Sequence, residues 1–233
     1  MKADKNFRQK PILPVLLTLA GVLVGLLLAL LAVWGDYEST AYGFLRRAQT
    51  SFGGLICPVF MGKNESNVVS IKISNPTDRT ISPSIQVEIS TPNELVSETE
   101  FTQLAPGEQI TLQKTIGPQN IDLGMFIFVN ALIFSTYPLP ARENTCGILV
   151  LPITRGAPLL IVGTVLSTLL MAVGTWILYK NKQSARKSRS MLFMVITTAL
   201  AMFLGFGGWW LVAGILIILS ILTLFITGGS FFT

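Results

Sequence analysis

The sequence contains no histidine and only two cysteines, and charged residues are absent from three long stretches. Histidine is the commonest general acid–base residue and the commonest metal ligand, so the usual groups of hydrolytic and metal-dependent chemistry are missing. Two cysteines alone do not complete a tetrahedral zinc site. Phosphate-binding glycine loops and nucleophile-elbow motifs are also absent. We therefore expect a protein that is not an enzyme and that holds no metal and no cofactor.

The charge-free stretches are long enough to cross a membrane. An apolar run of about 18 or more residues is typical of a transmembrane helix, because in lipid every backbone polar group must bond within its own segment. The third stretch is too long for one helix and is interrupted by Gly205-Phe-Gly-Gly-Trp-Trp210, so we expect it to form two spans. One long broken or re-entrant helix is the alternative. The predicted spans are residues 12–34, 156–179, 191–207 and 208–227, followed by a short tail, 228–233.

The distribution of charge predicts the orientation of these spans. Residues 36–155 carry 8 basic and 11 acidic side chains, a net charge of −3, and the rest of the chain therefore accounts for +8 of the total of +5. That basic excess lies in residues 1–11 and 180–190, and short loops rich in Lys and Arg stay in the cytoplasm. We expect a multi-pass protein of the cell membrane with both termini on the cytoplasmic side and the middle region on the outer side. The basic residues then indicate that the protein's partner is a lipid bilayer, and they do not indicate nucleic-acid binding.

The first charge-free stretch is longer than the apolar core of a signal peptide, so we expect an uncleaved anchor. Residues 35–54, which follow it, place apolar side chains at near-helical spacing. They predict a short amphipathic helix, lying either on the outer membrane surface or beneath the next domain. Trp34 and the pair Trp209 and Trp210 are expected at the membrane interface, where tryptophan is enriched.

Residues 55–155 change to a period of two, which is typical of half-buried strands. Proline- and glycine-containing turns separate the strands. Met125–Phe134 is apolar on both faces and too short to span lipid as a helix, so we expect a central strand. Six or seven short strands predict an antiparallel sandwich inserted between the first and second spans. The alternating strands are Val69 to Ile73, Ile85 to Ile89 and Ile110 to Leu112, with a last strand from Gly147 to Ile153.

Two motifs carry a resemblance to a known family. The strand Val68-Val-Ser-Ile-Lys-Ile-Ser leads into Asn75-Pro-Thr-Asp, and Leu104-Ala-Pro-Gly107-Glu leads into Gln109-Ile-Thr-Leu-Gln. This pattern resembles bacterial Ig-like or fibronectin-like surface domains and implies an Ig-like sandwich. The chain departs from antibody-type domains because no tryptophan lies between the cysteines. Its whole plan resembles bacterial multi-span membrane proteins with an exported domain of this kind.

Both cysteines, Cys57 and Cys146, lie in the region expected outside the cell. An even number of cysteines in an oxidising compartment predicts a disulfide, with two free buried thiols as the alternative. Closing so long a loop contributes about 4–5 kcal/mol in the chain-entropy model.

Small residues recur four apart in the first two spans and predict close helix packing, with chance recurrence as the alternative. They are Gly21, Gly25 and Ala29 in the first span and Gly163 and Ser167 in the second.

The predicted spans contain hydroxyl groups but no ionisable residue, which argues against proton-coupled transport. Glu94, Glu98 and Glu100 cluster in sequence, and we interpret them as solvating a polar strand or loop rather than as a catalytic pair. We therefore predict an accessory or scaffold subunit that binds other membrane subunits, or its own copies, through its exported domain. The alternatives are a small transporter or channel component with the sandwich as a lid, and a surface enzyme.

Overall fold

The computed structural model describes residues 12–44, 47–48, 50–92, 94–134, 139–180 and 185–232. The chain divides into two compact units. A helical unit comprises residues 1–29, 162–205 and 211–233, and a β unit comprises residues 30–161 and 206–210.

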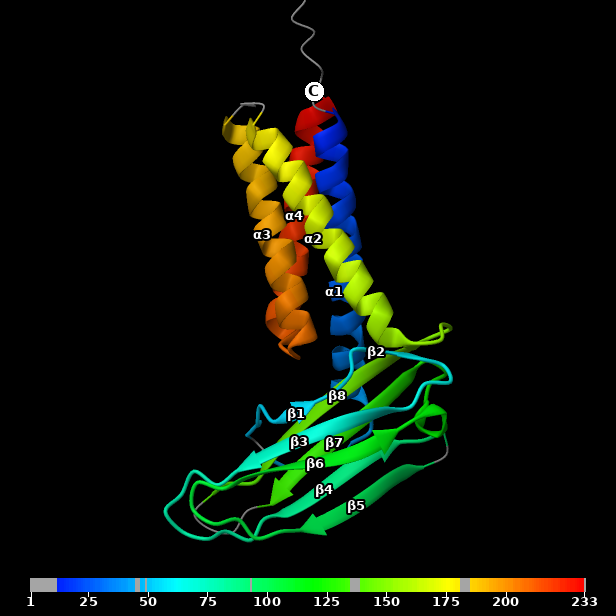
Figure 1. The fold of residues 1–233 in the computed structure, drawn as a ribbon, viewed down its shortest axis with the longest axis vertical. Coiled ribbons are helices and arrows are strands. Elements are labelled where there is room, and N and C mark those ends of the chain that lie inside the picture. Colours follow the sequence, from blue (N-terminus) through cyan, green and yellow to red (C-terminus); the bar gives the residue numbers. More distant parts are fainter. Residues whose placement is uncertain are drawn as a thin grey trace, which may run out of the picture. The chain divides into compact units, whose positions relative to one another are not determined.

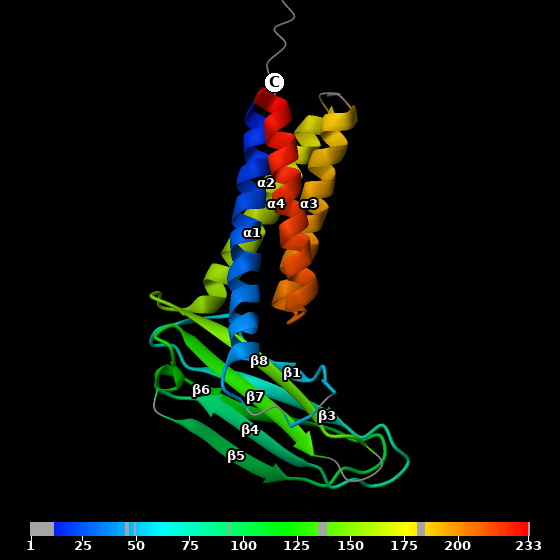
Figure 2. The same cartoon turned by 180° about the vertical axis from the view of Figure 1, so that it is seen from behind.

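The described residues form four α-helices: α1 (Ile12–Ala41), α2 (Gly156–Lys180), α3 (Ala185–Phe206) and α4 (Trp210–Phe232). Three of them, α1, α2 and α3 from Arg189 onward, are long and apolar enough to cross a membrane. The searched part of α4, Trp210–Ile226, is a shorter apolar helix. Figures 1 and 2 both show α3 and α4 running side by side.

The predicted glycine turn between the last two helices is present, because Gly208 adopts a φ of +78° that favours glycine. The helix bounds differ from the predicted spans. The first helix continues to Ala41, the third begins at Ala185, and the fourth extends to Phe232 through most of the predicted tail. A charge-free stretch shows which part of a helix can lie in lipid, whereas the helix continues for as long as its backbone hydrogen bonds do. The helices are therefore longer than the predicted spans.

The β unit contains two sheets, seen in Figure 1. A three-stranded sheet has the order β1-β3-β6, and a five-stranded sheet has the order β2-β8-β7-β4-β5. All pairs are antiparallel except β2 with β8, so the expectation of a purely antiparallel arrangement is wrong at that pair. The strands are β1 (Leu55–Ile56), β2 (Phe60–Gly62), β3 (Asn67–Ser74), β4 (Ser84–Ser90), β5 (Leu95–Phe101), β6 (Gln109–Ile116), β7 (Phe126–Phe134) and β8 (Arg142–Leu151).

The alternation seen in the sequence builds one core between the two sheets. Every second residue of a strand points to the same face, and the apolar set of each sheet faces the other sheet. Its buried contributors include Val69 and Ile71 on β3, Ile85 and Val87 on β4, Ile127, Val129 and Ala131 on β7, and Ile148 on β8.

The two turns that carry the family resemblance meet in space. The side-chain amide of Asn75 donates to the carbonyl oxygens of Leu104 and Ala105, both at 3.0 Å, and to that of Arg79 at 2.7 Å. The backbone N–H of Gly107 in turn donates to the carbonyl of Asn75 at 3.0 Å. Asn75 is buried, so these bonds satisfy a polar group that would otherwise cost stability. The asparagine and the proline–glycine turn therefore form one structural unit.

The outer face of the five-stranded sheet, opposite the core, is covered from within the β unit. The expectation of a separate amphipathic helix over residues 35–54 is wrong: α1 continues to Ala41, and the described residues of 42–54 are not helical. We call the described part of Tyr42–Gly54 the strap. Tyr42 lies 4.3 Å from Phe128 between ring centroids, and Trp34 lies 5.4 Å from Phe126. Aromatic side chains near the end of α1 and at the start of the strap thus pack on the outer face of the sheet.

Candidate functional site

A buried polar cluster fixes the strap to the outer face of the five-stranded sheet. Glu143 accepts hydrogen bonds from the backbone N–H groups of Arg47 at 2.8 Å and Ala48 at 3.0 Å. The side-chain amide of Asn130 donates to Glu143 at 2.9 Å and to Glu88 at 3.2 Å. Both carboxylates are less than a tenth exposed. Arg47 supplies the compensating positive charge, with its guanidinium 3.4 Å from Glu88.

This polar cluster has the composition of a structural anchor. Each buried carboxylate is paired or hydrogen-bonded, as buried charges must be if they are not to cost several kcal/mol each. No group of three or more His, Cys, Asp or Glu suited to a metal ion occurs in the part of the chain that the structure describes. Sequence reasoning missed this cluster because Arg47, Glu88, Asn130 and Glu143 are far apart in the chain.

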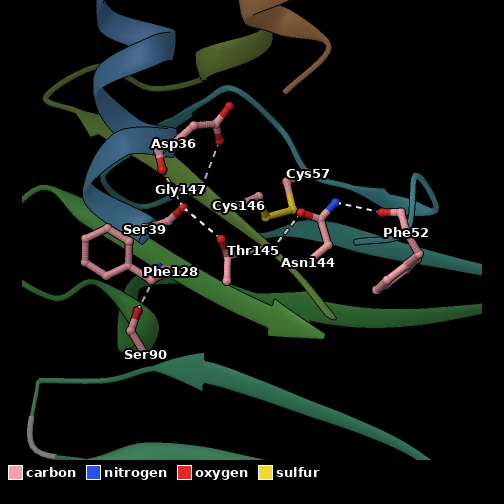
Figure 3. Close-up of a disulfide and its surroundings, with 10 residues drawn as sticks. All are labelled: Asp36, Ser39, Phe52, Cys57, Ser90, Phe128, Asn144, Thr145, Cys146 and Gly147. Atoms are coloured by element: carbon pink, nitrogen blue, oxygen red, sulfur yellow. Dashed lines mark hydrogen bonds between the residues drawn. A yellow bond between two sulfur atoms is a disulfide. The ribbon is translucent and has the colours of Figure 1, made fainter. Parts of the chain in front are cut away.

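The end of α1 approaches the same sheet face through two glycines. A Cβ added to Gly35 would lie 2.8 Å from the carbonyl oxygen of Gly147, and one added to Gly147 would overlap the carbonyl of Gly35. Asp36 accepts a hydrogen bond from the Gly147 N–H at 3.3 Å, and the Ser39 hydroxyl lies 3.4 Å from that of Thr145. Figure 3 shows these contacts beside the disulfide. Only glycine permits so close a backbone approach.

The predicted disulfide between Cys57 and Cys146 is present, with 6.5 Å between the two Cα atoms. Cys57 follows β1 of the smaller sheet, and Cys146 lies on β8 of the larger one, so the bond joins the two sheets. Beside it, the side-chain amide of Asn144 donates to the carbonyl of Phe52 at 2.9 Å and fixes the end of the strap (Figure 3).

The acidic cluster singled out in the sequence lies largely on β5, an outermost strand of the five-stranded sheet. Glu98 and Glu100 pair in register with Val87 and Ile85, so they lie on the inner face of the sheet. The Lys114 ammonium on β6 donates to both carboxylates, at 2.6 Å and 2.5 Å. The Glu100 and then the Glu98 hydrogen bonds raise the pKa of Lys114. These ion pairs join β5 of the five-stranded sheet to β6 of the three-stranded sheet.

The opposite side of β5 is a free edge. The carbonyl oxygen of Pro83 accepts the N–H of Thr102, and the carbonyl oxygen of Glu94 accepts the N–H of Thr91. In the register of β4 with β5, the even-numbered residues of β5 therefore form the hydrogen-bonded pairs with β4. Because bonded and non-bonded pairs alternate along an antiparallel ladder, the N–H groups of Ser97 and Thr99 point away from β4. β5 is exposed along nearly its whole length, and Phe101 at its end is 82% exposed.

In the helical unit, the small residues predicted for helix packing lie against other helices. A Cβ on Gly21 would stand 2.8 Å from the backbone of Met171, and one on Gly25 would stand 2.9 Å from the Thr198 side chain. The Ser167 hydroxyl donates to the Gly21 carbonyl at 2.8 Å. Ala29 is fully buried, and Gly163 contacts Leu28.

One further glycine of this kind was missed by sequence reasoning. Gly174 packs against the backbone and hydroxyl of Thr18 on α1. It lies seven residues after Ser167, on the same helical face, so extending the spacing by two turns would have found it.

The three tryptophans expected at the membrane interface belong to the β unit. Trp34 donates its indole N–H to Glu38 at 2.9 Å, and Trp209 is 65% exposed. Trp210 lies edge-on to Tyr37 at 5.9 Å.

Comparison with known proteins gives little beyond the geometry. No protein-family model matches the chain, and no curated protein matches it. Among solved structures, the CARDB domain of a Pyrococcus furiosus protein in complex with di-metal ions is 16% identical, with a TM-score of 0.35 over 42% of this chain and 84% of that one. A FixG-related protein from Vibrio parahaemolyticus is 15% identical, with a TM-score of 0.28 over 37% of this chain and 80% of that one. A Paenibacillus cycloisomaltooligosaccharide glucanotransferase is 14% identical, with a TM-score of 0.33 over 45% of this chain, which spans 14% of that enzyme.

Proposed function

We propose that the chain is a four-span membrane protein and a non-enzymatic accessory subunit of a larger membrane complex. In this proposal both termini are cytoplasmic, and an exported Ig-like sandwich between the first and second spans docks on a partner protein. Three apolar helices of spanning length support the membrane location. The disulfide supports placing the β unit in an oxidising compartment.

The observation that carries the docking role is the free edge of β5. A strand with outward N–H and C=O groups is a template on which an extended segment of another protein can add as a further strand. Main-chain bonds would supply affinity, and the exposed ring of Phe101 would supply an apolar anchor. The inward charges of Glu98 and Glu100 leave the main-chain groups of this edge free while fixing the strand itself.

The polar groups of the helical unit favour packing over transport. Most of the threonine hydroxyls with a described bond donate to carbonyl oxygens one turn earlier in the same helix, and such back-bonded groups do not line a polar path, whereas the buried Thr198 hydroxyl has no partner among the described residues. The bonds of this kind start from Thr18, Thr168, Thr175, Thr197 and Thr223. We therefore prefer the accessory role to a transporter with the sandwich as a lid.

The test is purification of the full chain from its native membranes in mild detergent. We expect other membrane subunits at a fixed stoichiometry with the wild type and with Thr99→Ala, and their loss with Thr99→Pro. Proline removes the outward N–H of Thr99 without breaking a bond to β4 and is tolerated at a strand edge. A lone monomer without crosslinked neighbours would contradict the proposal, as would equal recovery with Thr99→Pro. If only further copies of this chain are recovered, the complex is a homo-oligomer and not a hetero-complex.

A further inference from the structure

A cavity of about 430 Å³ opens at one end of the β unit, between the two sheets. β1 pairs with β3 only at Ser70 and Ile71, and the Gly54 carbonyl accepts one further N–H from Lys72. Beyond that point the edge of β3 is uncovered and the space between the sheets is accessible. Pockets that bind small molecules usually have volumes of about 300–1,000 Å³, so the cavity is large enough for one.

The floor of the cavity is apolar and fixed. Ile73, Ile81 and Ile133 line it and are almost fully buried core residues. Phe52 also lines the cavity, and its backbone is held by the amide of Asn144. Such a floor suits an aromatic or aliphatic group.

The polar part of the cavity is cationic. Arg142 lines it and pairs in register with Ile133, so its side chain lies on the inner face of the five-stranded sheet. Lys72 borders the cavity as well, but its side chain lies on the opposite face of β3 from the core residues Ile71 and Ile73. Among the described residues that line it, none is acidic. This is unusual in a region whose net charge is −3, from 8 basic and 11 acidic residues between positions 36 and 155.

Arg142 also lacks a carboxylate partner. Within the described residues, Arg47 and Lys114 form ion pairs with glutamates, whereas neither Arg142 nor Lys72 does. A half-buried guanidinium on an inner sheet face is favourable only if an anion or water solvates it, and a planar fork of donors matches a carboxylate or phosphate. Ser51, Ser74 and Gln109 also border the cavity.

We propose that this cavity binds a small anion carried on an apolar body, with the carboxylate or phosphate group paired to Arg142 and the body resting on Phe52 and the isoleucines. The site does not depend on the partner-docking role of β5, because the cavity lies at β3 and the start of β8.

The test measures binding of water-soluble probes to the full chain in lipid nanodiscs by ligand-observed NMR. The probes are phenylacetate and phenyl phosphate, with neutral phenylacetamide as the matched control. We expect at least one anion to bind saturably and at least about tenfold more tightly than the amide, which follows from the strength of hydrogen bonds to charged groups. Binding of phenylacetate alone identifies a carboxylate ligand, and binding of phenyl phosphate alone identifies a phosphate ligand.

Two variants place the binding in the cavity. Arg142→Gln should weaken anion binding at least about tenfold, whereas Arg79→Gln, at an exposed arginine elsewhere in the β unit, should leave it unchanged. Gly53→Leu should block the cavity while keeping Arg142, because a side chain at Gly53 meets only open space. Gly43→Leu is its control, since Gly43 is equally open and does not line the cavity. Equal binding of the neutral amide, binding of neither anion, or unchanged binding in both Arg142→Gln and Gly53→Leu would overturn the proposal.

Discussion

Replacement of Glu143 by alanine tests the cluster that fixes the strap. The carboxylate accepts three hydrogen bonds, from the backbone of Arg47 and Ala48 and from the side chain of Asn130. Its removal leaves the amide of Asn130 with one carboxylate partner, Glu88, in a site that is almost fully buried.

The size of the effect follows from these bonds. Hydrogen bonds to a charged group contribute about 1.5–3 kcal/mol each. A simple sum over the three bonds would overestimate the cost of the substitution, because neighbouring bonds are not additive. Breaking a buried charged network by removing one member costs about 3–5 kcal/mol, and we expect this range for Glu143→Ala. Glu143→Gln keeps an acceptor oxygen and the side-chain volume, so its effect should be smaller, about 1–2 kcal/mol.

Hydrogen–deuterium exchange of the full chain in nanodiscs measures this loss locally. The N–H groups of Arg47 and Ala48 are held by Glu143 itself, so they should exchange at least about a hundredfold faster in Glu143→Ala, which corresponds to about 3 kcal/mol. The amides of β3, in the other sheet, should change much less. Glu94→Ala is the matched control, because it removes one exposed carboxylate of the same unit.

Two outcomes would contradict this role of Glu143. Unchanged exchange at Arg47 and Ala48 in Glu143→Ala would show that the carboxylate does not hold the strap. An equal increase in Glu94→Ala would show that net charge, and not these bonds, determines the protection of the strap.

Three further predictions follow from the structure. Cys57→Ser with Cys146→Ser should lower the free energy of unfolding of the β unit by about 4–5 kcal/mol, measured by exchange of the core amides under non-reducing conditions; no change would contradict the role of the disulfide. The β unit should lose stability above about pH 10, because burial and the bond to Asp122 raise the pKa of Tyr42 while the two glutamates raise that of Lys114. Both groups have pKa values higher in the folded than in the unfolded chain, so their stabilisation is complete below that pH and decreases as pH rises. Amide exchange rates that stay constant from pH 9 to about 11, after correction for intrinsic exchange, would contradict this loss of stability. Gly25→Leu should disrupt the helical unit by about 1–3 kcal/mol or more, detected as a lower thermal unfolding temperature in detergent, whereas Gly214→Leu, which meets open space, should not.

Much of the fold could be predicted where the signal is local. The apolar alternation of β3, β4 and β6 and the length of the charge-free stretches follow directly from the pleat and the bilayer, so these elements were found. β5 was not, because Glu98 and Glu100 join Val96 on its inner face, so polar and apolar residues do not alternate along the strand. Inward-pointing charges are typical of edge strands, which is the signal that could have identified it.

The sites depend on long-range register, which local patterns do not determine. Arg142 faces the cavity because it pairs with Ile133, and Glu143 reaches the strap because the next residue of β8 points to the opposite face. A shift of one residue would exchange the two. Residues 35–54 were predicted to be helical from the spacing of their apolar side chains; the part up to Ala41 is helical as the end of α1, whereas Tyr42 beyond it packs against Phe128.

The most direct test of the accessory role is photocrosslinking in native membranes from a reactive amino acid placed at Thr99 on the free edge of β5. We expect a single discrete crosslinked partner from position 99, and none from position 111 on the solvent-exposed face of β6. The crosslink from position 99 should weaken when Phe101 is replaced by serine, because the exposed ring contributes to the interface. Absence of any crosslink from position 99, or the same products from both positions, would contradict the accessory role.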